Sequence, residues 1–321
     1  MDPGKLTISN PAMIQLLKAL AYLTLFCWPV SWVWGQDFEL AGASFTRFPK
    51  SELKDSRAAQ DLRLNEYSFF INLPKKFKNN KTVVINGLHY GALRPIAQND
   101  SSEGFEGQNL HLLGYRLTGF HAIGKGWGVV LVLNPTLAST FNVSLESEDF
   151  IFNGALQLVK RKSEDYSYGF GIARTTRFGG PLYLPIFHLS KRWKNSQLKL
   201  LLPRKIHYAY EFDKFSMGGR MDINGAFFNA NFSNSLPDGT VETIDKVAYS
   251  RVLVGPSCGY RLAKVLQLQA TGGLAVGRTI ELRGATSDNE NFNVENGPFF
   301  QFSIAIVPPR KKSDNGDVPA S

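Results

Sequence analysis

The chain has 321 residues, of which 43% are hydrophobic and 20% charged, and it contains 29 glycines but only 2 cysteines. This apolar content excludes a disordered chain, and the low cysteine count excludes a scaffold held by disulfides. The formal net charge is +9, from 36 basic and 27 acidic residues. Because the basic residues form no single block, we expect no nucleic-acid partner.

The first 35 residues have the pattern of a secretory signal peptide. Ala19–Val30 is almost entirely apolar, Lys18 precedes it, and the small residue Gly35 follows it. An apolar core of about 12 residues is too short for a transmembrane helix, which needs roughly 20. We therefore predict cleavage between Gly35 and Gln36. The mature chain then keeps one cysteine, Cys258, for which we expect a buried strand position.

Alternation with a period of two residues dominates the mature chain. Phe300 and Phe302, for example, fall on one face of an extended segment, and Gln301 falls on the other. No convincing helical period occurs, so the sequence predicts an all-β protein. The alternating runs cover about residues 38–48, 62–74, 82–94, 109–122, 127–139, 149–161, 166–177, 181–192, 215–231, 246–260, 264–283 and 297–307.

The length of these runs favours a membrane barrel. Most have 11 or more residues, whereas strands of globular proteins average about 5–6 and transmembrane strands need roughly 9–11. Short links such as Gly124–Gly126 alternate with long polar links such as Thr140–Glu148. Short turns on one side and long loops on the other are typical of outer-membrane barrels. A soluble β-sandwich is the alternative, but it would have shorter strands.

We therefore predict a transmembrane antiparallel up-and-down β-barrel over residues 36–307. Counting the runs gives 12 strands, with both chain ends on the periplasmic side. The segment Gln197–Lys214, interrupted by Pro203, adds either no strands or two. The alternative count is therefore 14, and parity excludes 13. The polar tail, residues 308–321, is expected to be disordered.

Motifs of enzyme or metal chemistry are weak in this sequence. Residues Gly255–Gly259 match the G-x-S-x-G pattern of serine hydrolases around Ser257, but no helical pattern follows and all five histidines lie upstream. No closely spaced histidine, cysteine and carboxylate cluster occurs. We therefore predict no catalytic residue, no cofactor and no metal ligand.

The most informative polar residues are those that face inward when the apolar face of each strand is turned to lipid. Five arginines against two acids would make such a lumen attractive to anions. Two alternatives stay open: a conductive lumen, or a lumen filled by side chains in which the arginines pair with the acids. The candidate lumen-lining residues are Glu66, Arg116, Asn153, Gln157, Arg161, Arg177, Arg220, Asp222, Asn224, Arg251, Gln267, Gln269 and Gln301.

Most of residues 36–307 resembles a known family, and a few segments carry the resemblance. Tyr168–Gly171 and Arg177–Pro185, followed by Leu200–Pro203, resemble an uncharacterised outer-membrane β-barrel family of the Bacteroidota. The resemblance implies a barrel located in the bacterial outer membrane, and it implies no activity and no site.

The expected function is that of a passive pore, transport element or structural element of the bacterial outer membrane. The expected partners are outer-membrane lipid and the outer-membrane assembly machinery, and the expected state is a monomer. One alternative is a membrane-embedded enzyme that acts on lipids. Another is an adhesive barrel whose outer loops, including the acidic segment Asp100–Glu106, bind partners.

Overall fold

The computed structural model describes residues 38–54, 61–97, 109–142, 144–235, 241–263, 265–284 and 290–308. The predicted signal peptide, the acidic segment Asp100–Glu106 and residues 309–321 of the predicted tail lie outside these residues. Within the described ranges, no helix is long and apolar enough to cross a membrane.

Strands make up nearly all of the described structure, with one short 3-10 helix, η2 (Ser147–Asp149). The strands are β1 (Ala41–Lys54), β2 (Asp61–Lys76), β3 (Thr82–Ala97), β4 (Leu110–Gly124), β5 (Trp127–Ser139), β6 (Phe150–Arg161), β7 (Tyr166–Thr175), β8 (Leu182–Arg192), β9 (Ser196–Leu202), β10 (Lys205–Phe212), β11 (Phe215–Ser235), β12 (Val241–Arg261), β13 (Leu266–Gly284), β14 (Glu290–Val294) and β15 (Gly297–Ile306).

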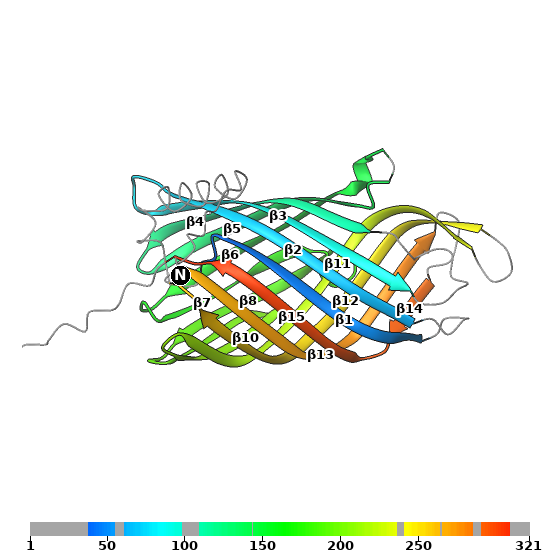
Figure 1. The fold of residues 1–321 in the computed structure, drawn as a ribbon. Helices are drawn as coiled ribbons and strands as arrows, with labels where there is room; N and C mark the ends of the chain where they lie inside the picture. The colour runs from blue at the N-terminus through cyan, green and yellow to red at the C-terminus, as the bar shows by residue number, and fades with distance from the viewer. Residues whose placement is uncertain are drawn as a thin grey trace, which may run out of the picture.

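The sheet closes into a barrel (Figure 1). Each strand from β1 to β13 pairs antiparallel with the next one in the chain, and β14 and β15 lie in line between β13 and β1. These last two elements therefore act as one interrupted strand, and the closed barrel has 14 strands. Closure pairs β1 with the last strands of the chain, so the sheet has no free edge strand.

The all-β closed barrel predicted from the sequence is confirmed, and so is its alternative count of 14 strands; the count of 12 was wrong. The difference comes from β9 and β10, which pair with each other and with β8 and β11. Their hairpin turns at Pro203 and Arg204. Because both strands are short, the alternating pattern covers too few residues to be recognised as strands in the sequence.

Apolar side chains cover the outside of the barrel. Alternate residues along the strands point outward, so Phe170 is 57% exposed and Phe302 is 61% exposed. Lysines lie over aromatic rings where the turns are short: the Lys160 Nζ is 5.1 Å from the ring centroid of Trp127, and the Lys191 Nζ is 5.1 Å from that of Trp193. We call this end of the barrel the short-turn end, and the opposite end the long-loop end.

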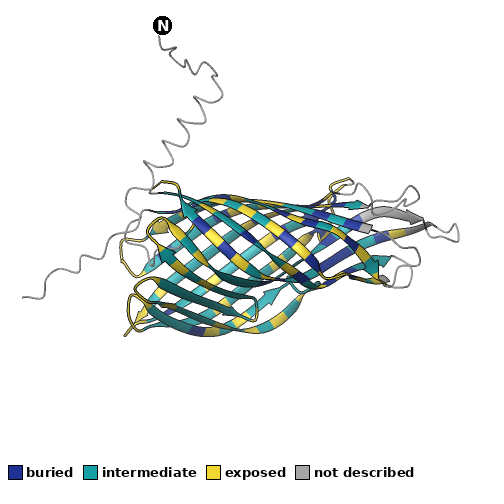
Figure 2. Ribbon diagram, turned by 60° about the horizontal axis from the view of Figure 1, so that its bottom comes forward, coloured by how far each residue is buried: buried dark blue, intermediate teal, exposed yellow. Residues whose placement is uncertain are grey.

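The strands differ greatly in length, and this difference shapes the barrel. β11 and β12 each have 21 residues, whereas β9 has 7 and β10 has 8. Towards the long-loop end only β1–β5 and β11–β14 continue, and β11 there pairs with β5 through Asn229 and Ser139. The barrel therefore has a wide half at the short-turn end and a narrow half at the long-loop end (Figure 2).

Candidate functional site

An apolar cluster fills the narrow half of the barrel. Phe48 of β1 is 0% exposed and Phe299 of β15 is 1% exposed, with their ring centroids 6.3 Å apart. We call this cluster the plug. Because its members face inward and are fully covered, the narrow half is packed like a protein core. The plug consists of Phe48, Leu62, Leu64, Leu93, Leu110, Ala138, Phe228, Ala230, Ile244, Val247, Tyr249, Leu253, Ala275, Ile280, Leu282, Val294 and Phe299.

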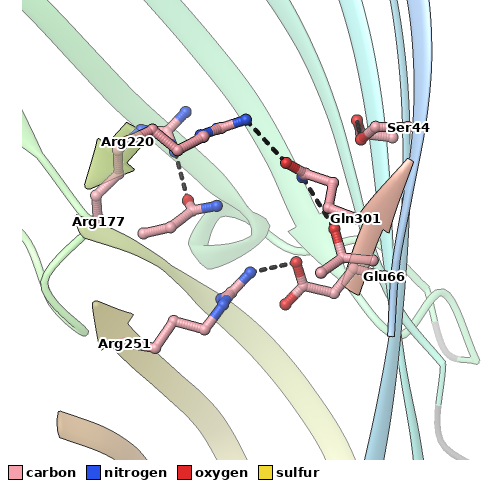
Figure 3. Close-up of polar contacts among 9 residues, drawn as sticks. Ser44, Glu66, Arg177, Arg220, Arg251 and Gln301 are labelled. Atoms are coloured by element: carbon pink, nitrogen blue, oxygen red, sulfur yellow. Dashed lines mark hydrogen bonds and ion pairs between the residues drawn. The ribbon is translucent and has the colours of Figure 1, made fainter. Parts of the chain in front are cut away.

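A buried ion pair borders the plug. Arg251 of β12 bonds across the lumen to the carboxylate of Glu66 on β2 (Figure 3). The Arg251 guanidinium also lies over two plug rings, 5.1 Å from the Phe48 centroid and 4.6 Å from that of Tyr249. The pair thus joins opposite walls, and its aromatic contacts anchor it to the plug.

A second chain of polar contacts crosses the lumen from β11 to β1. Arg220 forms a salt bridge of 2.6 Å with Asp222, and its Nη1 donates to the Gln301 Oε1 at 3.0 Å. The Gln301 amide then donates to the Thr46 hydroxyl at 3.0 Å (Figure 3). Both contacts of Arg220 with Asp222 are made to the Oδ2 atom of this carboxylate.

Beyond these pairs, the wide half holds further basic side chains, and the Asp222 carboxylate is the acid that acts on them. Arg177 lies in the β7–β8 connection and donates to Asn224 at 2.6 Å, and Arg116 of β4 donates to Asn134 at 3.3 Å. The Arg204 guanidinium repels Arg177 more strongly than the Asp222 carboxylate attracts it, so positive charge is in excess at this level.

We name Arg116, Arg177, Arg204 and Lys205 the basic vestibule. Arg204 lies in the β9–β10 turn, beside Lys205. Electrostatic repulsion acts between Arg204 and both Arg116 and Arg177. Lys205 lies directly opposite Asp222 in the β10–β11 pairing, so this one carboxylate faces both Lys205 and Arg220. Among the described residues, no side-chain hydrogen bond or ion pair is found for Arg204 or Lys205, so their donors can bind an anion.

The wide half is accessible to solvent, in contrast to the plug. Ser68 points inward and bonds to Ser44 at 2.7 Å, yet it is exposed. The same half has a pocket of about 160 Å³, lined by residues that include Asn72, His89 and Arg116. The lumen is therefore open in its wide half and sealed in its narrow half.

The other predicted lumen residues take several positions. Asn153 donates to the Thr176 hydroxyl at 3.2 Å. Arg161 lies at the short-turn end of β6, where its Nε donates to the Ser163 carbonyl at 3.2 Å. The alternation of their strands turns Gln157, Gln267 and Gln269 inward, and each is half-buried. Arg177 was expected within a strand, but it lies beyond the end of β7, and its side chain reaches back to the lumen side.

Sequence reasoning missed several inward-facing basic residues, among them Arg204, Lys205 and Arg278. Arg204 and Lys205 belong to the segment whose strands were left unassigned. Arg278 of β13 is 1% exposed and donates to the Ser51 hydroxyl at 2.7 Å, although strict alternation would turn it outward. Gly277, with φ +56°, precedes a shift in the pairing with β12 and reverses the parity. Gly277 is the sequence feature from which this reversal of alternation could have been predicted.

The hydrolase-like segment lies wholly within β12. Ser257 is buried, and no strand–turn–helix geometry surrounds it. Cys258 was expected to be buried but is exposed, because the alternation of β12 turns it to the outside. No group of three metal-binding side chains is found in the part of the chain that the structure describes.

Several solved outer-membrane structures resemble this fold. The COG4313 outer membrane channel from Pseudomonas putida F1 aligns over 86% of this chain and 99% of its own, with 9% identity and a TM-score of 0.40. The beta domain of the Bordetella autotransporter BrkA aligns over 84% of this chain and 100% of its own, with 12% identity and a TM-score of 0.27.

The protease OmpT from Escherichia coli aligns over 84% of this chain and 94% of its own, with 8% identity and a TM-score of 0.25. No curated protein matches the chain. One protein family does match, over residues 39–306, and this range includes every strand of the barrel. The chain therefore belongs to the family described as a domain of unknown function, DUF6268.

Proposed function

We propose that this protein is a bacterial outer-membrane barrel that takes anionic solutes into the basic vestibule, and that the plug closes the route in the conformation described. The single observation that carries the proposal is the excess of basic over acidic side chains inside the wide half. The proposal thus combines the two alternatives left by the sequence: the wide half is a polar lumen, and the narrow half is filled by side chains.

The surface of the barrel supports a membrane location. Outward residues such as Phe170 and Phe302 are large, apolar and exposed, as is required of a face solvated by acyl chains. At the short-turn end, Trp127 and Trp193 lie close to lysines. Aromatic rings at the headgroup level with lysines extending to water are typical of a membrane interface.

The charge balance inside the lumen supports an anionic solute. The two acids of the predicted set are both engaged, Glu66 with Arg251 and Asp222 with Arg220. The four cations of the basic vestibule therefore outnumber the acids that face them, in a lumen that is open to water. Fixed cations in a narrow aqueous space attract anions and repel cations.

Planar-bilayer recordings test this proposal. We expect the wild-type barrel to conduct weakly, and the double variant Phe48→Ala, Phe299→Ala to conduct more strongly with a preference for chloride over potassium. Adding Arg116→Glu and Arg204→Glu should reverse that preference. Arg94→Glu is the matched control, because Arg94 is exposed on the outward face of β3. A preference for potassium in the plug variant would overturn the proposal.

The proposal also includes the oligomeric state, the assembly machinery and the bacterial origin expected from the sequence. We infer that the protein works as a monomer and that the assembly machinery recognises its last strand, β15 (Gly297–Ile306), from within the chain. The origin in the Bacteroidota also stays a prediction, which rests on the resemblance of the segments around Tyr168–Gly171 and Arg177–Pro185.

A further inference from the structure

The wall of the barrel is incomplete above the short β9–β10 hairpin. Residues Leu182–Ile186 of β8 pair with β7 on one side, but β9 reaches only as far as Phe187 on the other. Residues Asn224–Phe228 of β11 likewise pair with β12. The last backbone bond from β11 to the hairpin runs from the Ile223 N–H to the Arg204 carbonyl at 2.8 Å. In the described ranges, no backbone pairing joins β8 to β11, so two free strand edges face a gap.

The gap begins within the thickness of a membrane. A strand of 7 residues such as β9 rises roughly 23 Å at about 3.3 Å per residue, and a tilt of about 40° reduces its height to about 18 Å. The apolar band of a transmembrane barrel is about 25 Å tall. The top of the hairpin, with Arg204, therefore lies below the level of the far headgroups.

The β7–β8 connection, residues 176–181, covers this gap, and we call it the strap. Two side-chain hydrogen bonds hold it to the wall in the described structure, Asn153 to Thr176 at 3.2 Å and Arg177 to Asn224 at 2.6 Å. It crosses β11 at Gly225, where a Cβ atom would lie 2.5 Å from the Arg177 carbonyl oxygen.

The strap leaves a space beside it on the outer wall. A cavity of about 450 Å³ lies between it and the outer faces of β12, β13 and β14, lined by residues that include Phe178, Leu182 and Glu281. This volume falls in the range of pockets that hold small molecules, about 300–1,000 Å³. The strap therefore borders a cavity into which it could be displaced.

The inner rim of the gap combines apolar and cationic side chains. Leu184 and Ile186 of β8 and Leu201 of β9 face inward by the register of their strands, and all three are half-buried. They lie outside the plug. The cationic side chains near this rim are Arg177 in the strap and Arg204 in the hairpin turn. A small hydrophilic anion would gain no favourable contact from the apolar side chains of Leu184, Ile186 and Leu201.

We propose that the gap is a lateral route by which a single-chain amphiphile with an anionic head group passes between the membrane and the basic vestibule. The head group binds Arg177 and Arg204, and the alkyl chain lies along Leu184, Ile186 and Leu201. This inference rests on the proposed function, because it uses the same basic vestibule. The lateral route identifies the substrate as an amphiphile, which enters from the membrane through the barrel wall.

Photo-crosslinking with defined probes tests the route. The mature chain is placed in phosphatidylcholine nanodiscs with dodecanoate carrying a terminal diazirine, or with a matched probe whose head group is trimethylammonium. Labelled residues are mapped by mass spectrometry. We expect the anionic probe to label Leu184, Ile186 or Leu201 at least about tenfold more than the cationic probe, the ratio that one charge-assisted hydrogen bond supports. Outward-facing Phe302 should be labelled equally by both.

Two variants separate the parts of the proposal. Arg177→Gln with Arg204→Gln should abolish the head-group preference at the three inner positions, whereas Arg94→Gln, the outward-facing control, should preserve it. Gly225→Ala should displace the strap and speed labelling. The single variant Arg204→Gln serves where the double variant does not fold, and it should weaken the preference.

Each outcome bears on one of the two proposals. Head-group-independent labelling, or labelling confined to outward residues, overturns the lateral route. If the plug variant nevertheless prefers chloride, the proposed function stands and only the lateral route fails. If the plug variant prefers potassium, the proposed function fails, whatever the labelling pattern.

Discussion

Replacing Phe299 with alanine tests whether the narrow half of the barrel is a packed core. Phe299 is 1% exposed and its ring lies 6.3 Å from that of Phe48, which is 0% exposed. Truncating a buried phenylalanine to alanine costs about 3–5 kcal/mol, because the lost transfer free energy adds to the cost of the cavity left behind. We expect the free energy of unfolding to fall by this amount. Because the two rings lie close together, the double variant should cost less than the sum of the single variants.

Denaturant unfolding of the barrel refolded in micelles measures this loss. Phe302→Ala is the matched control, since Phe302 is 61% exposed on the outward face of the same strand. Detergent or lipid chains fill the space left there, so no cavity forms and the cost is the transfer contribution alone, about 2 kcal/mol. Equal losses for Phe299→Ala and Phe302→Ala would show that the lumen is not packed at this level. The explanation of the closed state would then be refuted.

Three further predictions follow from the lumen and the wall. Glu66→Gln should lower the unfolding free energy by about 3–5 kcal/mol, because it leaves the buried Arg251 without its counter-charge; the double variant Glu66→Leu, Arg251→Met should recover most of this loss in the same denaturant titration. Gly277→Val should destabilise the barrel by about 1–3 kcal/mol, since a β-branched residue disfavours φ +56°, and an unchanged midpoint would contradict the assigned bulge. Gly218→Val should reduce the yield of heat-modifiable, folded barrel on a gel, because a Cβ there would lie 1.9 Å from the Tyr208 carbonyl oxygen; normal folding would show that β10 and β11 are less closely apposed.

Strand alternation accounts for the part of the site that sequence reasoning reached. A side chain two residues along a strand returns to the same face, so the pattern around Glu66 and Arg220 suffices to group them with the polar face. It does not say which of these residues meet. Arg251 and Glu66 are 185 positions apart in the chain, and only the closure of the sheet brings β12 opposite β2.

Local irregularities explain what the sequence missed. A single bulge at Gly277 turns Arg278 from the outside to the inside, and one such residue is invisible to a pattern that assumes strict alternation. The β9–β10 hairpin has 7 and 8 residues, too few for a convincing alternating run. Because this hairpin was not assigned, the predicted strand count was too low, and Arg204 and Lys205 were not recognised as lumen residues.

By itself, the sequence determined that the chain forms long amphipathic strands that close into an all-β barrel, because a period of two residues and the apolar outer face are local properties. Only the tertiary structure decided that one half is sealed and the other is basic and open. The reason is that strand lengths differ around the wall: where β6–β10 end early, β11 pairs with β5, the circumference shrinks, and the inward apolar residues come close enough to pack.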